Sequence, residues 1–116
     1  MANTFKVKTN AAMPASAGTP LTLYTVPGST TTVILGLRLA NVDGSTRTAT
    51  VQLVSDTSDT ETNETVKLVD DAPIPAGSSI EIMGGAKVVL QTTDILKIDC
   101  DTAAKIDATL SIMEIT

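Results

Sequence analysis

Apolar and polar residues alternate along most of this chain, with a period of two. The clearest case is the stretch Thr31–Val42, in which Val33, Leu35, Leu37 and Leu39 occupy every second position. Successive side chains of a β-strand point to opposite faces of a sheet, so this period predicts a strand with a buried face. We expect these four residues to face the core. The residues between them are mostly small or apolar too, which favours cover on both faces.

Turn-forming residues such as Pro27-Gly28 and Asp43-Gly44 separate the alternating stretches. Many short strands between closely spaced turns are typical of a sandwich or barrel. We therefore predict an all-β fold, a jelly-roll-like antiparallel β-sandwich of about eight or nine short strands, in a single domain spanning residues 1–116. The expected strands are Thr4–Lys8, Leu21–Val26, Thr31–Val42, Arg47–Val54, Glu64–Val69, Ser78–Met83, Ala86–Gln91, Asp94–Cys100 and Ile106–Ile115.

Two details of this pattern carry further expectations. Pro73 and Pro75 are expected to break any central strand after Val69, because proline cannot donate a hydrogen bond to a neighbouring strand. In the last strand the apolar phase changes after Ile112, where Glu114 replaces the next apolar residue. This change predicts a bulge, or a strand end that a partner buries on its other side.

The core has to be almost entirely aliphatic, because Phe5 and Tyr24 are the only aromatic residues. A thin aliphatic core favours a homo-oligomer in which neighbouring copies supply more burial, a trimer being one possibility. A monomer packed with Leu, Ile, Val and Ala is the alternative. Cys100 follows the alternation of its strand, so we interpret it as a small buried apolar residue and not as a reactive thiol.

Charge and hydropathy exclude several classes of partner. The net charge is −5 and the eight Lys and Arg residues are scattered, so neither a nucleic acid nor an anionic membrane is an expected partner. No apolar stretch has the length of a signal peptide core or of a membrane span. These features predict synthesis in a reducing cytoplasm without an export signal in the chain itself.

The residue types that most catalytic sites need are missing. The chain has no His, which excludes Ser-His and Cys-His catalysis, so we predict that it is not an enzyme and uses no cofactor. Asp101-Thr102-Ala103 resembles an aspartic protease triplet in which Ala replaces the Gly, and an acidic turn is the favoured interpretation. Asp56, Asp59 and Glu61 are weak candidates for Ca²⁺ ligands, because they are oxygen donors in a polar loop. A solvated acidic loop is the alternative, since Glu61 stands where an EF-hand requires Gly.

Five segments with strand and turn patterns stand out in the sequence: residues 30–37, 54–66, 72–82, 85–98 and 106–115. These segments resemble small virion structural proteins of tailed bacteriophages, above all those of marine phages that infect cyanobacteria. The resemblance extends over nearly the whole chain. It implies a non-enzymatic virion protein, made in the host cytoplasm, that acts as head decoration or in association with the neck or fibres. Its expected partners are copies of itself and other virion proteins.

Four residues are expected to form the contact surface of such a protein. Phe5, Tyr24, Met113 and Ile115 are apolar and lie near a terminus or outside a regular core stripe. The alternative for each is an ordinary core position. A ligand-binding module that uses the acidic loop at 56–64 for Ca²⁺ or a glycan is the alternative function.

Overall fold

A computed structural model describes residues 2–11, 19–55, 63–83 and 87–116. Within these residues the chain forms nine β-strands and no helix, as the alternation predicts. None of the described residues belongs to a helix that could cross a membrane. The strands are β1 (Asn3–Asn10), β2 (Leu21–Thr25), β3 (Thr31–Asn41), β4 (Arg47–Val54), β5 (Thr65–Ile74), β6 (Ser79–Glu81), β7 (Val88–Leu90), β8 (Ile95–Cys100) and β9 (Ile106–Ile115).

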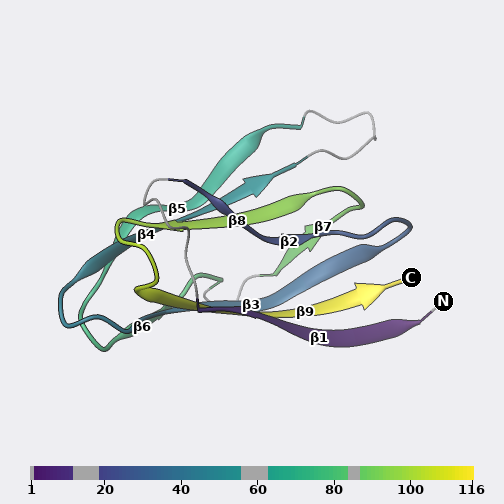
Figure 1. Ribbon diagram of the computed structural model, residues 1–116. Coiled ribbons are helices and arrows are strands. Elements are labelled where there is room, and N and C mark those ends of the chain that lie inside the picture. Colours follow the sequence, from purple (N-terminus) through teal and green to yellow (C-terminus); the bar gives the residue numbers. More distant parts are fainter. Residues whose placement is uncertain (1, 12–18, 56–62, 84–86) are drawn as a thin grey trace.

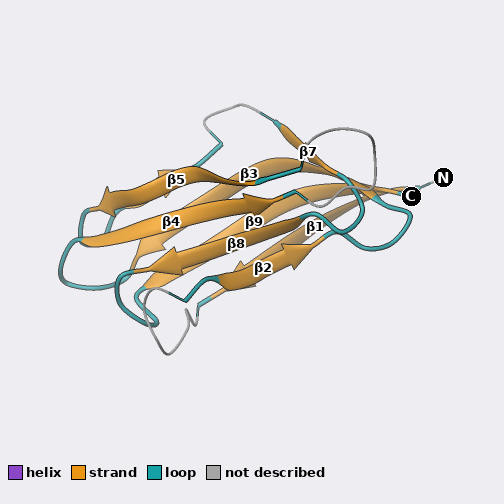
Figure 2. Cartoon of the chain, turned by 90° about the horizontal axis from the view of Figure 1, so that it is seen from above, coloured by secondary structure: helices purple, strands orange, loops and turns teal. Residues whose placement is uncertain are grey.

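The strands form two antiparallel sheets that pack face to face (Figure 1). Sheet A has the order β1-β9-β3-β6, and β7 pairs with β3 on the same side as β6. Sheet B has the order β2-β8-β4-β5. Seen from above, the strands of sheet B lie over those of sheet A and run in roughly the same direction (Figure 2). The expected antiparallel β-sandwich is confirmed.

The order of the strands is that of a jelly roll. β6 and β7 pair with opposite ends of β3, so they are two halves of one interrupted strand. Counted in this way, sheet A has the order 1-8-3-6 and sheet B the order 2-7-4-5. The chain therefore changes sheet at almost every connection, as a double Greek key requires.

The core lies between the sheets and is built from the inward positions of the alternation. Apolar side chains of β4, β8 and β9 face it as expected, and Cys100 is buried among them. The largest fully buried apolar residues are Ile34, Leu37, Leu39, Val51, Ile74, Leu90, Leu96, Ile98, Ile106, Leu110 and Ile112. Burial of each contributes about 1.5–3 kcal/mol to the stability of the fold.

The prediction for β3 was only half right. Leu37 and Leu39 are fully buried, but Ile34 is buried in place of Val33 and Leu35. The cause is a β-bulge between Ile34 and Gly36, where β3 has one residue more than the facing part of β9. An extra residue shifts the alternation by one position. Even-numbered residues of β3 such as Ile34 therefore face the core before the bulge, and odd-numbered residues such as Leu37 face it after the bulge.

Two other expectations need correction. β9 pairs with β1 in an uninterrupted register through Glu114. The Glu114 side chain points to the core, where it is 5% exposed. The bulge that the sequence offered as one explanation lies instead in β3, and the other explanation, a strand end that a partner covers, stays a prediction. β5 also runs on to Ile74, past Pro73, because β5 is an edge strand and one side of its backbone needs no partner.

Candidate interaction surface

The outer face of sheet A carries a row of apolar side chains that crosses four strands. In the strand register, Phe5 is opposite Met113, Met113 is opposite Val33, and Val33 is opposite Val89. Residues directly opposite each other share a face, and the adjacent Ile34 and Ile112 point into the core. The four residues Phe5, Met113, Val33 and Val89, here called the apolar row, therefore all point away from the core.

The apolar row is open to solvent at both ends. Phe5 is 71% exposed and Val89 is 56% exposed, while Met113 and Val33 are half-buried between them. Of the large apolar residues that are exposed in the described part of the chain, only Val42 and Val66 lie outside sheet A. Exposed apolar residues scattered singly need no explanation, but a continuous row across a sheet marks a contact surface.

The rows on either side extend this surface. Ile115 is half-buried one row beyond Met113, and Val7 is 60% exposed on the other side, opposite Ser111. Leu35, the residue that the bulge of β3 adds, is also exposed. The sheet A patch, defined as the apolar row together with Val7, Leu35 and Ile115, lies at the end of the sandwich where both chain ends are found (Figure 1).

Beside the patch the outer face is hollowed. A shallow depression of about 440 Å³ is lined by Gly36, Arg38, Glu81, Thr109 and Ser111. Gly36 has no side chain to fill it, and its outward position follows directly from the bulge. Glu81 lines the depression from β6, and its Oε1 accepts a 2.8 Å hydrogen bond from the backbone N–H of Leu37.

The structure places three of the four expected contact residues together on this surface and the fourth elsewhere. Phe5, Met113 and Ile115 all belong to the sheet A patch. Tyr24 is instead 6% exposed and packs in the core, where its hydroxyl reaches Glu114 of β9. Sequence reasoning did not select Val33 and Val89, although the apolar residues on both faces of the Thr31–Val42 stretch were a signal for Val33.

Tyr24 fastens one sheet to the other through a buried polar cluster. Its hydroxyl donates a 2.5 Å hydrogen bond to Oε2 of Glu114 and lies 2.8 Å from Oγ1 of Thr32. Lys6 forms an ion pair with Oε1 of Glu114 at 2.7 Å. Burial, followed by the hydrogen bond to Glu114, raises the pKa of Tyr24 to about 12. The hydrogen bonds from Lys6 and Tyr24 hold the pKa of Glu114 below its usual range. Each polar group in this cluster has a hydrogen-bond or ion-pair partner within it, so we interpret the cluster as a contact that holds the two sheets together.

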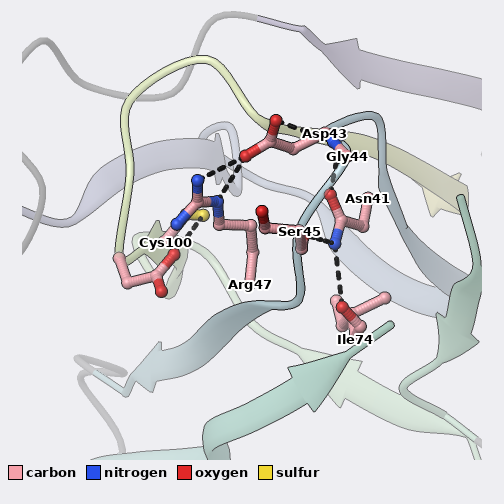
Figure 3. Close-up of polar contacts among 8 residues, drawn as sticks. Asn41, Asp43, Gly44, Ser45, Arg47, Ile74 and Cys100 are labelled. Atoms are coloured by element: carbon pink, nitrogen blue, oxygen red, sulfur yellow. Dashed lines mark hydrogen bonds and ion pairs between the residues drawn. The ribbon is translucent and has the colours of Figure 1, made fainter. Parts of the chain in front are cut away.

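A second polar cluster supports the turn from β3 to β4 (Figure 3). Nδ2 of Asn41 donates hydrogen bonds of 2.8 Å to the carbonyl oxygens of Ser45 and Ile74. Asp43 accepts a 2.6 Å hydrogen bond from Nε of Arg47 and one of 2.7 Å from the N–H of Gly44. These two bonds lower the pKa of Asp43. The turn joins sheet A to sheet B, so this cluster is also structural.

The other candidate sites offer no comparable arrangement. On sheet B, Thr50, Asp71, Asp99 and Asp101 line a small hollow of about 120 Å³. Within the part of the chain that the structure describes, no group of His, Cys, Asp or Glu is arranged to hold a metal ion. Asp101, Thr102 and Ala103 lie in the turn after β8. The weak Ca²⁺ candidates Asp56, Asp59 and Glu61 lie outside the described residues.

Comparisons with known proteins give similarity to solved structures alone. No family model matches the sequence, and no curated protein matches it. A protein of Bacillus endospore appendages, which form disulfide-linked pili, shares 17% identity with a TM-score of 0.49, over 99% of this chain and 87% of that chain. A chain of the infectious bursal disease virus Gx strain shares 11% identity with a TM-score of 0.46, over 96% of this chain and 37% of that chain. At this level of likeness, neither structure indicates what this chain does.

Proposed function

We propose that this chain is a non-enzymatic structural protein of a phage virion, and that it assembles with other proteins through the sheet A patch. The observation that carries the proposal is the apolar row, which leaves Phe5 71% exposed on a regular sheet. Exposed apolar residues of this extent cost solubility unless another protein covers them. The resemblance of the sequence to small virion proteins of tailed phages supports the virion as the place of assembly.

The physical character of the surface fits assembly better than catalysis. The apolar row contains no charged or nucleophilic group, so its contribution is burial of apolar area. The polar residues that are buried in the described part of the chain are engaged in the fold, as the clusters at Tyr24 and Asn41 show. Head decoration and association with the neck or fibres are the positions that this proposal covers.

The test uses virions of the phage that encodes the chain. We expect mass spectrometry of separated heads, necks and tails to find the protein in one of these sub-particles. Purified protein should rebind particles from which it has been stripped, and Phe5→Ser should lose that binding. Val66→Ser is the matched control, because Val66 is an exposed apolar residue of β5 on the other sheet. Absence from every sub-particle would contradict the proposal.

A further inference from the structure

The outer face of sheet A carries an exposed aromatic side chain in the sheet A patch and a depression beside it. Phe5 is the most exposed of the large apolar residues described, and it lies on β1, at the edge of the sheet. The depression lies on β9 and β3, at the level of Ser111 and Thr109. With a rise of about 3.3 Å per residue and about 4.8 Å between strands, the two features are roughly 10–15 Å apart. One face therefore carries both a protrusion and a hollow.

The hollow has room for an aromatic ring. A cavity of about 150 Å³ holds a benzene molecule, and the depression measures about 440 Å³. Its wall includes Arg38, whose side chain is 63% exposed and whose Nε lies 3.9 Å from Oε2 of Glu81. A guanidinium group stacks favourably on an aromatic face, so Arg38 suits a Phe ring as its neighbour.

The lack of net charge in and beside the sheet A patch indicates which kind of protein binds there. The chain carries a net charge of −5, yet the residues that share the patch rows on sheet A are uncharged: Asn3, Ile115, Thr31, Phe5, Met113, Val33, Val89, Val7, Ser111 and Gly36. The two charged residues that line the depression beside these rows, Arg38 and Glu81, have opposite signs and lie 3.9 Å apart. A strongly basic or acidic partner would therefore find no net opposite charge on this part of the face. A second copy would meet a surface of the same uncharged kind, without the repulsion that the net charge imposes elsewhere.

We infer that two copies of this chain pair through the outer faces of their A sheets, with Phe5 of each copy in the Gly36 depression of the other. A two-fold axis through the midpoint between Phe5 and the depression places both contacts in one continuous interface. That midpoint falls near Ser111 on β9, which is half-buried. The pairing names the partner of the proposed assembly surface, so it rests on the proposed function.

Sedimentation equilibrium of the purified chain tests the pairing. We expect a dimer, with Phe5→Ser weakening dimerisation at least about 30-fold, as truncation of a central aromatic contact does. Thr109→Trp should weaken it similarly by filling the depression from β9, where Thr109 is exposed. Val66→Ser should leave it unchanged. Circular dichroism of each variant checks that the fold is retained.

The position of the axis has its own test. Ser111→Cys should be joined to its own mate by a short bismaleimide, since two copies of this residue meet near the axis. The same reagent should not join the wild type, because its only cysteine, Cys100, is 4% exposed. The double variant Phe5→Ser, Ser111→Cys should also stay unlinked.

The results separate this inference from the proposed function. A monomer at high concentration, a trimer, or a dimer that Phe5→Ser leaves intact would overturn the pairing. If such a protein still bound phage particles through Phe5, the proposed function would stand without it. If the dimer forms as described and the protein is absent from virions, the pairing stands and the virion role falls.

Discussion

At the scale of single residues, the buried polar groups decide how this fold is held. Glu114 lies where the alternation of β9 calls for an apolar residue, and it is 5% exposed. Its charge is tolerated because Lys6 and Tyr24 both bond to it. A buried carboxylate without such partners would cost several kcal/mol. Tyr24 and Lys6 come from strands of different sheets, so one carboxylate ties the sheets together.

We predict that this tie weakens in acid. The pKa of Glu114 is lower in the folded chain than in the unfolded chain, so the folded state binds its proton less readily. Its stabilisation is therefore complete above the unfolded pKa, near 4.3, and is lost as the pH falls through the folded value. Urea unfolding between pH 7 and pH 3 should show this loss. Glu114→Gln should be about 1–2 kcal/mol less stable at pH 7 and should lose less stability on acidification.

Asp70→Asn is the control for that experiment. Asp70 pairs with Lys67 at 3.1 Å, but both side chains are about half exposed, and such pairs contribute little. The variant should follow the wild-type curve. Equal loss of stability on acidification in Glu114→Gln and the wild type would show that Glu114 is not the group responsible.

At the scale of elements, the bulge of β3 determines both the core and the surface. It turns Ile34 inward, leaves Leu35 exposed, and puts Gly36 on the outer face. It also lies where the neighbouring strand is interrupted between β6 and β7. Glu81, the last residue of β6, lies beside this interruption, and its carboxylate accepts a hydrogen bond from the backbone N–H of Leu37.

We predict that Glu81 stabilises the bulge through the hydrogen bond that its oxygen accepts, and not through its negative charge. Glu81→Ala should cost about 1 kcal/mol, because it removes the acceptor of the Leu37 N–H. Glu81→Gln keeps an oxygen in the same place and should cost less. Hydrogen exchange measured by NMR should show faster exchange of the Leu37 amide in the Ala variant alone. Unchanged protection in Glu81→Ala would contradict this role.

Much of the element structure could be predicted from the sequence, and the failures have a common cause. The strand at Arg47–Val54 was predicted with its observed bounds, and the inward residues Ile106 and Leu110 of β9 were also identified. The bulge could not be predicted, because alternation does not show where a strand gains a residue. The burial of Glu114 could not either, since its partners Tyr24 and Lys6 are distant in the chain. The contact surface could not be predicted in full for the same reason, because its rows join residues of β1, β3, β7 and β9 that are far apart in the sequence.

At the scale of the whole molecule, the two sheets share one aliphatic core. The residues of this core come from both sheets, and many of them are less than 2% exposed. Neighbouring strands are often far apart in sequence, as the pairing of Asn3 with Ile115 shows. Strand pairs of this kind form slowly, so folding in milliseconds to seconds is expected.

We predict that the Cys100 thiol reports the opening of this core. It is 4% exposed, and burial raises its pKa, so both access and thiolate formation are suppressed in the folded chain. A chromogenic disulfide reagent at pH 8 should react at least about 100-fold more slowly with the folded protein than with the urea-unfolded protein. The midpoint of reactivity in urea should match the midpoint seen by circular dichroism. Rapid labelling without urea would show that this end of β8 opens locally.

The backbone bonds between Ala2 and Thr116, of 3.0 and 3.2 Å, bring the first and last described residues side by side. A short peptide could join these ends without bending either strand, and the chain could then be reopened at the Gly44 turn. Such a circular permutant would keep every strand neighbour while changing the order in which the strands are synthesised. A cargo fused before Ala2 or after Thr116 would instead emerge on the strands that carry Phe5 and Ile115, so a tag at either position would obstruct the same patch.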